Sequence, residues 1–180
     1  MRKSALTAAL VLAVAAAPAF AGQQKHKTSK PANDTTFVTK AAQGGLAEVE
    51  LGKLAQQKGT SAEVKTFGQR MVDDHSKAND ELKSIAQQKN ITLPTTIDPK
   101  DKALQARLEK LSGPAFDRAY MQAMVTDHKK DVSEFRTESQ SGRDSDIKAF
   151  AAKTLPTLED HLRLAQDANK AVGTSGTLPK

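Results

Sequence analysis

The sequence has no cysteine, no tryptophan and only 4% aromatic residues among its 180 positions. Without cysteine the chain can form no disulfide and can carry no lipid on a leading cysteine, so its stability must come from packing or from a bound ligand. Aromatic and β-branched residues are scarce beside the abundant Ala, Leu, Lys and Gln, which favours helices over strands. We therefore expect an all-α protein, and the length suits one domain with its own core.

The part of the chain that we expect to fold has no excess of charge of either sign. The formal net charge is +6, but six of the 27 lysines and arginines lie before residue 34 or after residue 172. The remaining 21 balance the 21 aspartates and glutamates, all of which lie between these two positions. A nucleic-acid-binding surface needs a basic face with few acidic residues interleaved. We therefore expect no nucleic-acid partner.

The first 21 residues have the pattern of a signal peptide. Arg2 and Lys3 precede an apolar run over residues 5–17, and Ala19-Phe20-Ala21 is the small-x-small pattern that precedes signal-peptidase cleavage. We predict cleavage after Ala21 and a mature protein that is periplasmic or secreted. The apolar run is short for a membrane span and no second run follows, so we expect no membrane span in the mature chain.

The rest of the chain has helical periodicity, with apolar residues at spacings of three and four. The predicted long helices are 34–58, with Asp34 as its cap, 60–90, 114–139 and 145–172, and a short helix is predicted over 99–111. The linker that holds the short helix is about 20 residues long, whereas a direct hairpin needs only a few, so it should cross the length of the bundle. We predict a four-helix bundle over residues 34–172, between a flexible basic leader (22–33) and a flexible tail (173–180).

A repeated segment carries most of the histidines. Met71-Val72-Asp73-Asp74-His75 returns as Met124-Val125-Thr126-Asp127-His128, and a third Asp-His pair follows at Asp160-His161. Three of the four histidines lie in these segments, and the fourth, His26, lies between lysines in the leader, where we expect it to be solvated. Helical phasing separates the members of each pair: the histidines fall on the inner stripe of their helices, and the aspartates fall at its edge or outside it.

Each of the four long helices places an ionisable group on an otherwise apolar face. These groups are Glu48, His75, His128 with Asp131 one turn later, and His161. Their positions along the helices put them near one level of an antiparallel bundle. Imidazole nitrogen and carboxylate oxygen are the usual ligands of Zn, Cu, Fe and Mn in proteins. We therefore predict a transition-metal site made of these five residues, without a choice among the four metals.

Neighbouring residues suggest two refinements of this site. Asp74, Asp127 and Asp160 are placed to accept hydrogen bonds that would orient an imidazole on a neighbouring helix. Met71 and Met124 lie one turn before His75 and His128. They are either ordinary core residues or soft sulfur ligands, which would favour copper.

Three functions remain open on these observations. In the first, an exported bundle binds, buffers or senses a transition metal without catalysis. In the second, the chain is an envelope stress or interaction module, and Glu48 and Asp131 hydrogen-bond the histidines in a metal-free structural network. In the third, a bound metal supports oxidoreductase chemistry, which needs an open coordination position. The sequence has no cysteine and no recognisable serine nucleophile motif, so hydrolysis is not favoured.

The chain resembles the bacterial domain-of-unknown-function family numbered 4142, often labelled outer membrane protein and grouped with ferritin-like folds. The residues that carry the resemblance are the segment 44–52, Met71-Val72-Asp73-Asp74-His75, Leu111-Ser112-Gly113, Asp127-His128 and Leu155-Pro156. The resemblance implies an exported, ferritin-like four-helix bundle and brings no settled activity. Ferritin-type diiron sites use Glu-x-x-His on two helices. This chain has His128-x-x-Asp131 instead, so ferroxidase chemistry is not expected.

Overall fold

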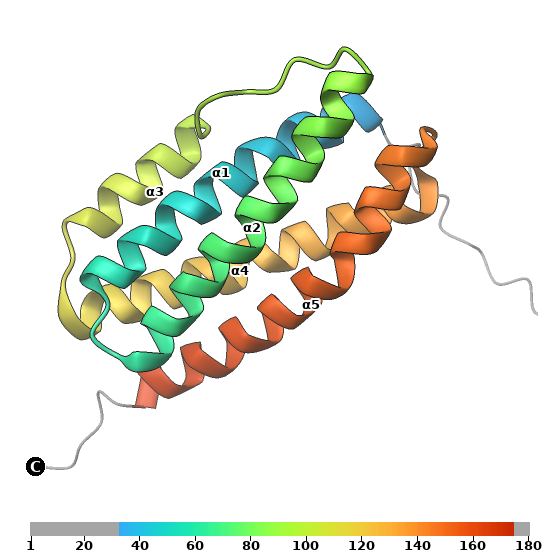
Figure 1. The fold of residues 1–180 in the computed structure, drawn as a ribbon. Helices are drawn as coiled ribbons and strands as arrows, with labels where there is room; N and C mark the ends of the chain where they lie inside the picture. The colour runs from blue at the N-terminus through green and yellow to red at the C-terminus, as the bar shows by residue number, and fades with distance from the viewer. Residues whose placement is uncertain (1–32, 175–180) are drawn as a thin grey trace, which may run out of the picture.

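A computed structural model describes residues 33–174, which form five α-helices and no strand (Figure 1). The helices are α1 (Asp34–Lys58), α2 (Ala62–Gln88), α3 (Pro99–Glu109), α4 (Gly113–Ser141) and α5 (Ser145–Thr174). None of these five is long and apolar enough to cross a membrane. The predicted all-α class is confirmed, and every predicted helix is present. The predicted signal peptide, the leader up to residue 32 and the tail from residue 175 lie outside the described residues.

The four long helices form a bundle of two antiparallel hairpins. α1 packs along α2 and α4 packs along α5, while α2 also contacts α5 and α1 also contacts α4. The segment after α2 returns along the outside of the bundle through α3, so that α4 begins at the same end as α2 (Figure 1). α3 contacts α1 and α4. The ferritin-like bundle with a long crossover that contains a short helix is therefore confirmed.

Polar side chains at the helix starts explain most of the boundaries. Ser61 and Asp98 accept hydrogen bonds from the backbone N–H groups three residues later and cap α2 and α3. The prediction for α1 was wrong by one residue, because Asn33 caps this helix by accepting from the Thr36 N–H at 3.1 Å. Asp34 is already inside the first turn, and its carboxylate instead accepts from the backbone N–H of Asp144 at 2.7 Å. This contact ties the start of α1 to the turn between α4 and α5.

The apolar core consists of two clusters that lie toward opposite ends of the bundle. One cluster includes Leu51, Phe67, Met71, Tyr120, Met124 and Ala165. The other includes Phe37, Leu82, Val132, Phe135, Phe150 and Leu158. Along α2, α4 and α5 the chain passes from one cluster to the other through His75, His128 and His161, all of which are buried. The bundle therefore has a polar layer between two apolar ones.

Glycines set how closely α1 approaches α2. A Cβ atom on Gly52 would lie 2.6 Å from the carbonyl oxygen of Gly68, and a Cβ atom on Gly45 would lie 2.0 Å from the Asn79 side chain. At Gly44 a Cβ atom would meet nothing within 4 Å. The α1 backbone therefore lies close to α2 at Gly45 and Gly52, whereas Gly44 has open space beside it.

Candidate metal centre

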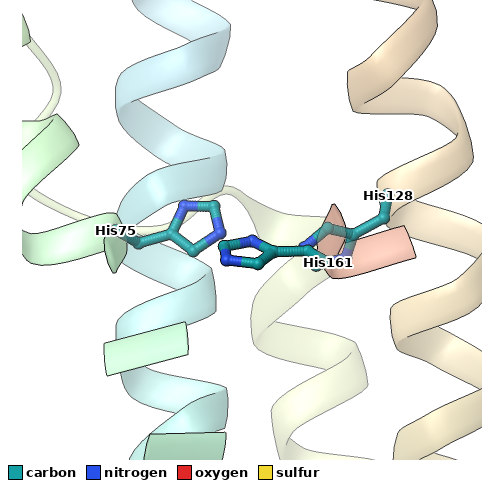
Figure 2. A group of neighbouring side chains, drawn as sticks. All are labelled: His75, His128 and His161. Carbon is teal, nitrogen blue, oxygen red and sulfur yellow. The ribbon is translucent and has the colours of Figure 1, made fainter. Parts of the chain in front are cut away.

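Three buried histidines meet in the polar layer of the bundle. His75 comes from α2, His128 from α4 and His161 from α5, and Figure 2 shows the three rings turned toward one another. One ring nitrogen of each lies within 4.8 Å of those of the other two. The ring centroids are 5.4 to 5.9 Å apart. Side-chain phase along three separate helices thus brings the predicted histidines to one point, here called the three-histidine group.

Hydrogen bonds fix which nitrogen two of these rings present. The carbonyl oxygen of Met124 can only accept, so His128 donates to it from Nδ1 at 3.0 Å and keeps the lone pair on Nε2. The Asp74 carboxylate likewise accepts from His161 Nε2 at 3.0 Å, which leaves the lone pair on Nδ1. His128 Nε2, His161 Nδ1 and His75 Nε2 are all buried without a hydrogen-bond partner. An unpartnered buried polar atom costs about 1–3 kcal/mol. Three in one group therefore need an explanation.

The protonation state of the group suits metal coordination. Burial, together with the proximity of His128 and His161, lowers the pKa of His75 well below 6.5. Burial and His161 lower the pKa of His128 to about 4, against the opposing effect of its bond to Met124. Burial also lowers the pKa of His161, although its bond to Asp74 opposes the shift. All three rings are therefore neutral at pH 7, which is the form of imidazole that binds metals.

Asp74 holds His161 from the neighbouring helix. Its carboxylate lies 27% exposed at the seam between α2 and α5 and also accepts from Arg70 Nε at 3.3 Å. Partial burial opposes its ionisation, but the hydrogen bonds from His161 and Arg70, together with the positive charge of Arg70, outweigh burial, so the pKa of Asp74 is lowered. An aspartate that accepts from the second nitrogen of an imidazole is the usual support of a metal-binding histidine. The sequence predicted this role for Asp74. It did not predict the contribution of Arg70, although Arg70 lies four residues before Asp74, a spacing at which side chains on a helix meet.

The other two aspartates of the Asp-His pairs do not support an imidazole in this way. Asp160 forms ion pairs with Arg70 at 2.7 Å and Arg163 at 2.6 Å. Asp127 lies on the α3 side of α4, where it lines a surface groove with Asp101. Of the three aspartates, Asp74 alone has a described hydrogen bond to a histidine ring. The histidines are therefore the shared element of the repeat, as helical phasing predicted.

Glu48 lies behind His128 and outside the three-histidine group. Glu48 Oε1 lies 3.8 Å from His128 Nδ1, and that nitrogen already donates to Met124. Glu48 is 1% exposed, and neither of its carboxyl oxygens has a hydrogen-bond partner. Burial, and then the negative charges of Asp127 and Asp131, raise its pKa well above 4.5. Burial thus favours the neutral form of the Glu48 carboxyl, which faces the bonded nitrogen of His128 and not its unpartnered one.

Asp131, the fifth residue of the predicted site, also lies apart from the group. Its side chain is 14% exposed and lies 3.6 Å from Lys130 Nζ. Burial and the negative charge of Asp127 raise its pKa to about 7. The structure thus brings together His75, His128 and His161, and places Glu48 and Asp131 around them. Met71 and Met124 are fully buried members of an apolar cluster, and the backbone carbonyl of Met124 supports His128.

An all-α bundle with a crossover helix and a buried three-histidine group is the class that fold and site define. The chain belongs to the family Domain of unknown function (DUF4142), which matches residues 17–168. The suspected family is thereby confirmed. No curated protein sequence matches the chain.

Solved structures share this fold at low sequence identity. A DUF305 fragment from Deinococcus radiodurans has a TM-score of 0.67 at 14% identity, covering 80% of this chain and 99% of the fragment. CopM in its Cu(II)-bound form also has a TM-score of 0.67 at 14% identity, covering 79% and 99% of the two chains. The conserved hypothetical protein rv2844 from Mycobacterium tuberculosis has a TM-score of 0.57 at 14% identity, covering 78% and 90%. These likenesses establish the helical fold.

Proposed function

We propose that this protein binds a transition metal ion at the three-histidine group, that copper in its monovalent form is the metal, and that the role is binding rather than catalysis. The observation that carries the proposal is the set of three buried, unpartnered nitrogens, one each from His75, His128 and His161. A metal ion accepts all three lone pairs at once and removes the cost of leaving them unpaired.

The donor set favours a soft ion of low charge. Imidazole nitrogens suit Cu, Zn, Fe and Ni, and the group itself contributes no carboxylate. Burying an uncompensated divalent charge among neutral ligands costs more than burying a monovalent one. CopM, which has a similar fold, has been solved in Cu(I)-bound, Cu(II)-bound and Ag-bound forms. That likeness supports copper as the metal to test first.

The competing interpretation is a metal-free network that only holds the helices together. Such a network stabilises a core when every buried polar atom has a partner. Here the Glu48 oxygens and one nitrogen of each histidine have none among the described residues. The polar layer is thus poorly suited to a purely structural role. Only the other ring nitrogens of His128 and His161 have described partners, namely the Met124 carbonyl and the Asp74 carboxylate.

Export is part of the same proposal. The first 21 residues have the sequence pattern of a cleaved signal peptide, which would place the mature protein in the periplasm or outside the cell. A histidine-based site suits such a compartment, because it does not depend on thiols that oxidise there, and the chain has no cysteine.

Thermal unfolding of the mature chain tests the proposal. Cu(I), kept reduced with ascorbate, should raise the Tm, because a ligand at 100 times its Kd stabilises the folded state by about 2.7 kcal/mol. Ag(I), as a second monovalent soft ion, should act similarly, and Zn(II) should act less. His75→Ala should abolish the shift, whereas His26→Ala, which removes the one histidine outside the site, should leave it intact. The absence of a shift with any metal, or a shift that survives His75→Ala, contradicts the proposal.

A further inference from the structure

A small cavity inside the bundle reaches the three-histidine group. Its volume is about 30 Å³, roughly that of one water molecule. All four long helices contribute to its wall, which includes Gly44, His75, Asn79, Asp131, Glu134 and Leu158. His75 is 7% exposed, and its Nε2 is one of the unpartnered nitrogens. The lining of the cavity therefore includes a side chain that the proposed metal would bind.

Charged residues at the seam between α1 and α4 also line this cavity. Lys40 and Glu134 line the cavity and also line a surface groove of about 240 Å³ on the same seam. Lys40 Nζ lies 3.6 Å from a Glu134 carboxylate oxygen, and the two side chains are 56% and 32% exposed. Asp131 lines the cavity one turn before Glu134, with its side chain 14% exposed. Two carboxyl groups thus share the lining of the cavity with His75, and one of them, Glu134, also lines the surface groove.

The wall of this cavity is open at Gly44. A Cβ atom added there would meet nothing within 4 Å. At Gly45, the next residue, the Asn79 side chain already occupies the place that a Cβ atom would take. Glycine inside a helix is unfavourable relative to alanine. Contact with α2 explains the glycine at position 45. Gly44 lines the cavity, and its lack of a side chain leaves space there.

We propose that this cavity is the route by which the cation reaches the three-histidine group, with Asp131 and Glu134 attracting the ion at the mouth and Lys40 restricting its passage. The inference rests on the proposed function. A group with two histidines fully buried and the third nearly so needs a path for an ion to arrive and leave. Carboxylates that line a narrow, low-dielectric passage raise the local concentration of cations and the rate of association. This gives Asp131 a role at the passage instead of in the group.

A route has a kinetic signature that distinguishes it from a ligand. A change in the passage alters the barrier to binding and the barrier to release equally, so both rates change by the same factor and Kd stays constant. A change in a ligand weakens the bound state and raises Kd. Gly44→Leu adds a side chain at the open wall and should narrow the passage. Gly44→Ala adds a single methyl group at the same place and is the matched control.

The experiment follows the transfer of Cu(I) to and from a chromophoric chelator by stopped-flow absorbance, with the mature chain at pH 8, where the Asp131 carboxyl is mostly ionised. Gly44→Leu should lower uptake and release together by about tenfold or more, with Kd changed by less than about twofold. Gly44→Ala should behave almost as the wild type. Unchanged rates in a folded Gly44→Leu protein, or a raised Kd with unaltered uptake, would overturn the route.

Charge at the mouth provides a second test that does not depend on Gly44→Leu folding. Asp131→Asn and Glu134→Gln should each slow Cu(I) uptake and weaken its dependence on ionic strength, and Lys40→Ala should accelerate it. If none of the three substitutions changes the rate of Cu(I) uptake, the route is wrong, but the three-histidine site can still be the binding site. Failure of the wild type to bind Cu(I) at all is a different result, because it removes the proposed function itself.

Discussion

The two sides of His128 differ in how their polar atoms are arranged. On the side of α2 and α5, the three rings converge, each with one buried nitrogen that has no partner, and the other nitrogens of His128 and His161 are held by hydrogen bonds. On the side of α1, Glu48 is buried without a partner, close to Asp127 and Asp131. The first side offers lone pairs from supported rings, which is the arrangement of a metal site. The second holds an acid whose pKa is raised by burial. Both are unusual for a core, but only the first is prepared for a ligand.

The largest effect is expected from removal of His128, the residue that lies between the two sides. His128→Ala should weaken Cu(I) binding by more than about 100-fold, since loss of a supporting acceptor alone costs 10–100-fold. Competition titration against a Cu(I) chelator measures the change. A variant that keeps wild-type affinity would show that His128 is not a ligand. His26→Ala again serves as the control for loss of a histidine outside the group.

Removal of the support of His161 should have the next largest effect. Asp74→Ala removes the hydrogen bond to His161 Nε2, so that the ring is no longer held in one orientation. We expect Cu(I) affinity to fall by about 10–100-fold. Asp160→Ala is the matched control, because Asp160 pairs with Arg70 and Arg163 at the same surface. The same titration, run on both variants, should separate them. Equal losses in the two variants would mean that the surface ion pairs, and not the bond to His161, set the affinity.

The two sides should also respond to pH in opposite senses. The unfolded chain protonates His128 near pH 6.5, whereas the folded protein does so only near its lowered pKa of about 4. The stability that neutral His128 contributes is thus complete above pH 6.5 and is lost as the pH falls toward 4. The pKa of Glu48 is raised by burial, so above pH 4.5 the unfolded chain releases a proton that the folded chain retains, and stability falls as the pH rises. Each group changes stability by at most about 1.4 kcal/mol per pH unit.

Urea unfolding of the metal-free protein over a range of pH measures both slopes. Glu48→Gln should flatten the decline at high pH, because glutamine is neutral in both states, and should leave the decline at low pH in place. An unchanged decline at high pH in Glu48→Gln would show that the Glu48 carboxyl is not held neutral by the fold.

The smallest expected effect is that of Glu48 on metal affinity. Because Glu48 faces the bonded nitrogen of His128, Glu48→Gln should change Cu(I) affinity by less than about threefold, well below the effect of losing a ring support. The titration used for His128→Ala applies here without modification. A loss comparable to that of His128→Ala would indicate that Glu48 turns into the group and binds the metal.

Much of the fold followed from local sequence signals. Helical periodicity, the caps at Ser61 and Asp98 and the length of the crossover predicted the helices and their wiring, because each depends on residues close in the chain. The convergence of His75, His128 and His161 followed from phase, since all three lie on apolar stripes. The predicted cap of α1 was wrong because the Asp34 carboxylate bonds instead to the turn at Asp144, more than a hundred residues away in the chain.

The sequence placed Glu48 and Asp131 less well than the histidines. Helical phase gives the face of a residue but not its rotamer, and a difference of a few ångströms puts a carboxyl on one side of His128 or the other. The bond from His128 to the Met124 carbonyl was not predictable from residue types, because the acceptor is backbone. The cavity beside His75 depends on the spacing of four helices, which no single segment encodes.

X-ray absorption spectroscopy of the Cu(I)-loaded mature protein tests the central claim most directly. Three imidazoles predict a shell of three nitrogen ligands at about 2.0 Å with the outer-ring scattering of histidine. His128→Ala should lose one of them. A shell dominated by oxygen or by sulfur, or a nitrogen shell that is the same in His128→Ala, would contradict the assignment of the three-histidine group as a metal site.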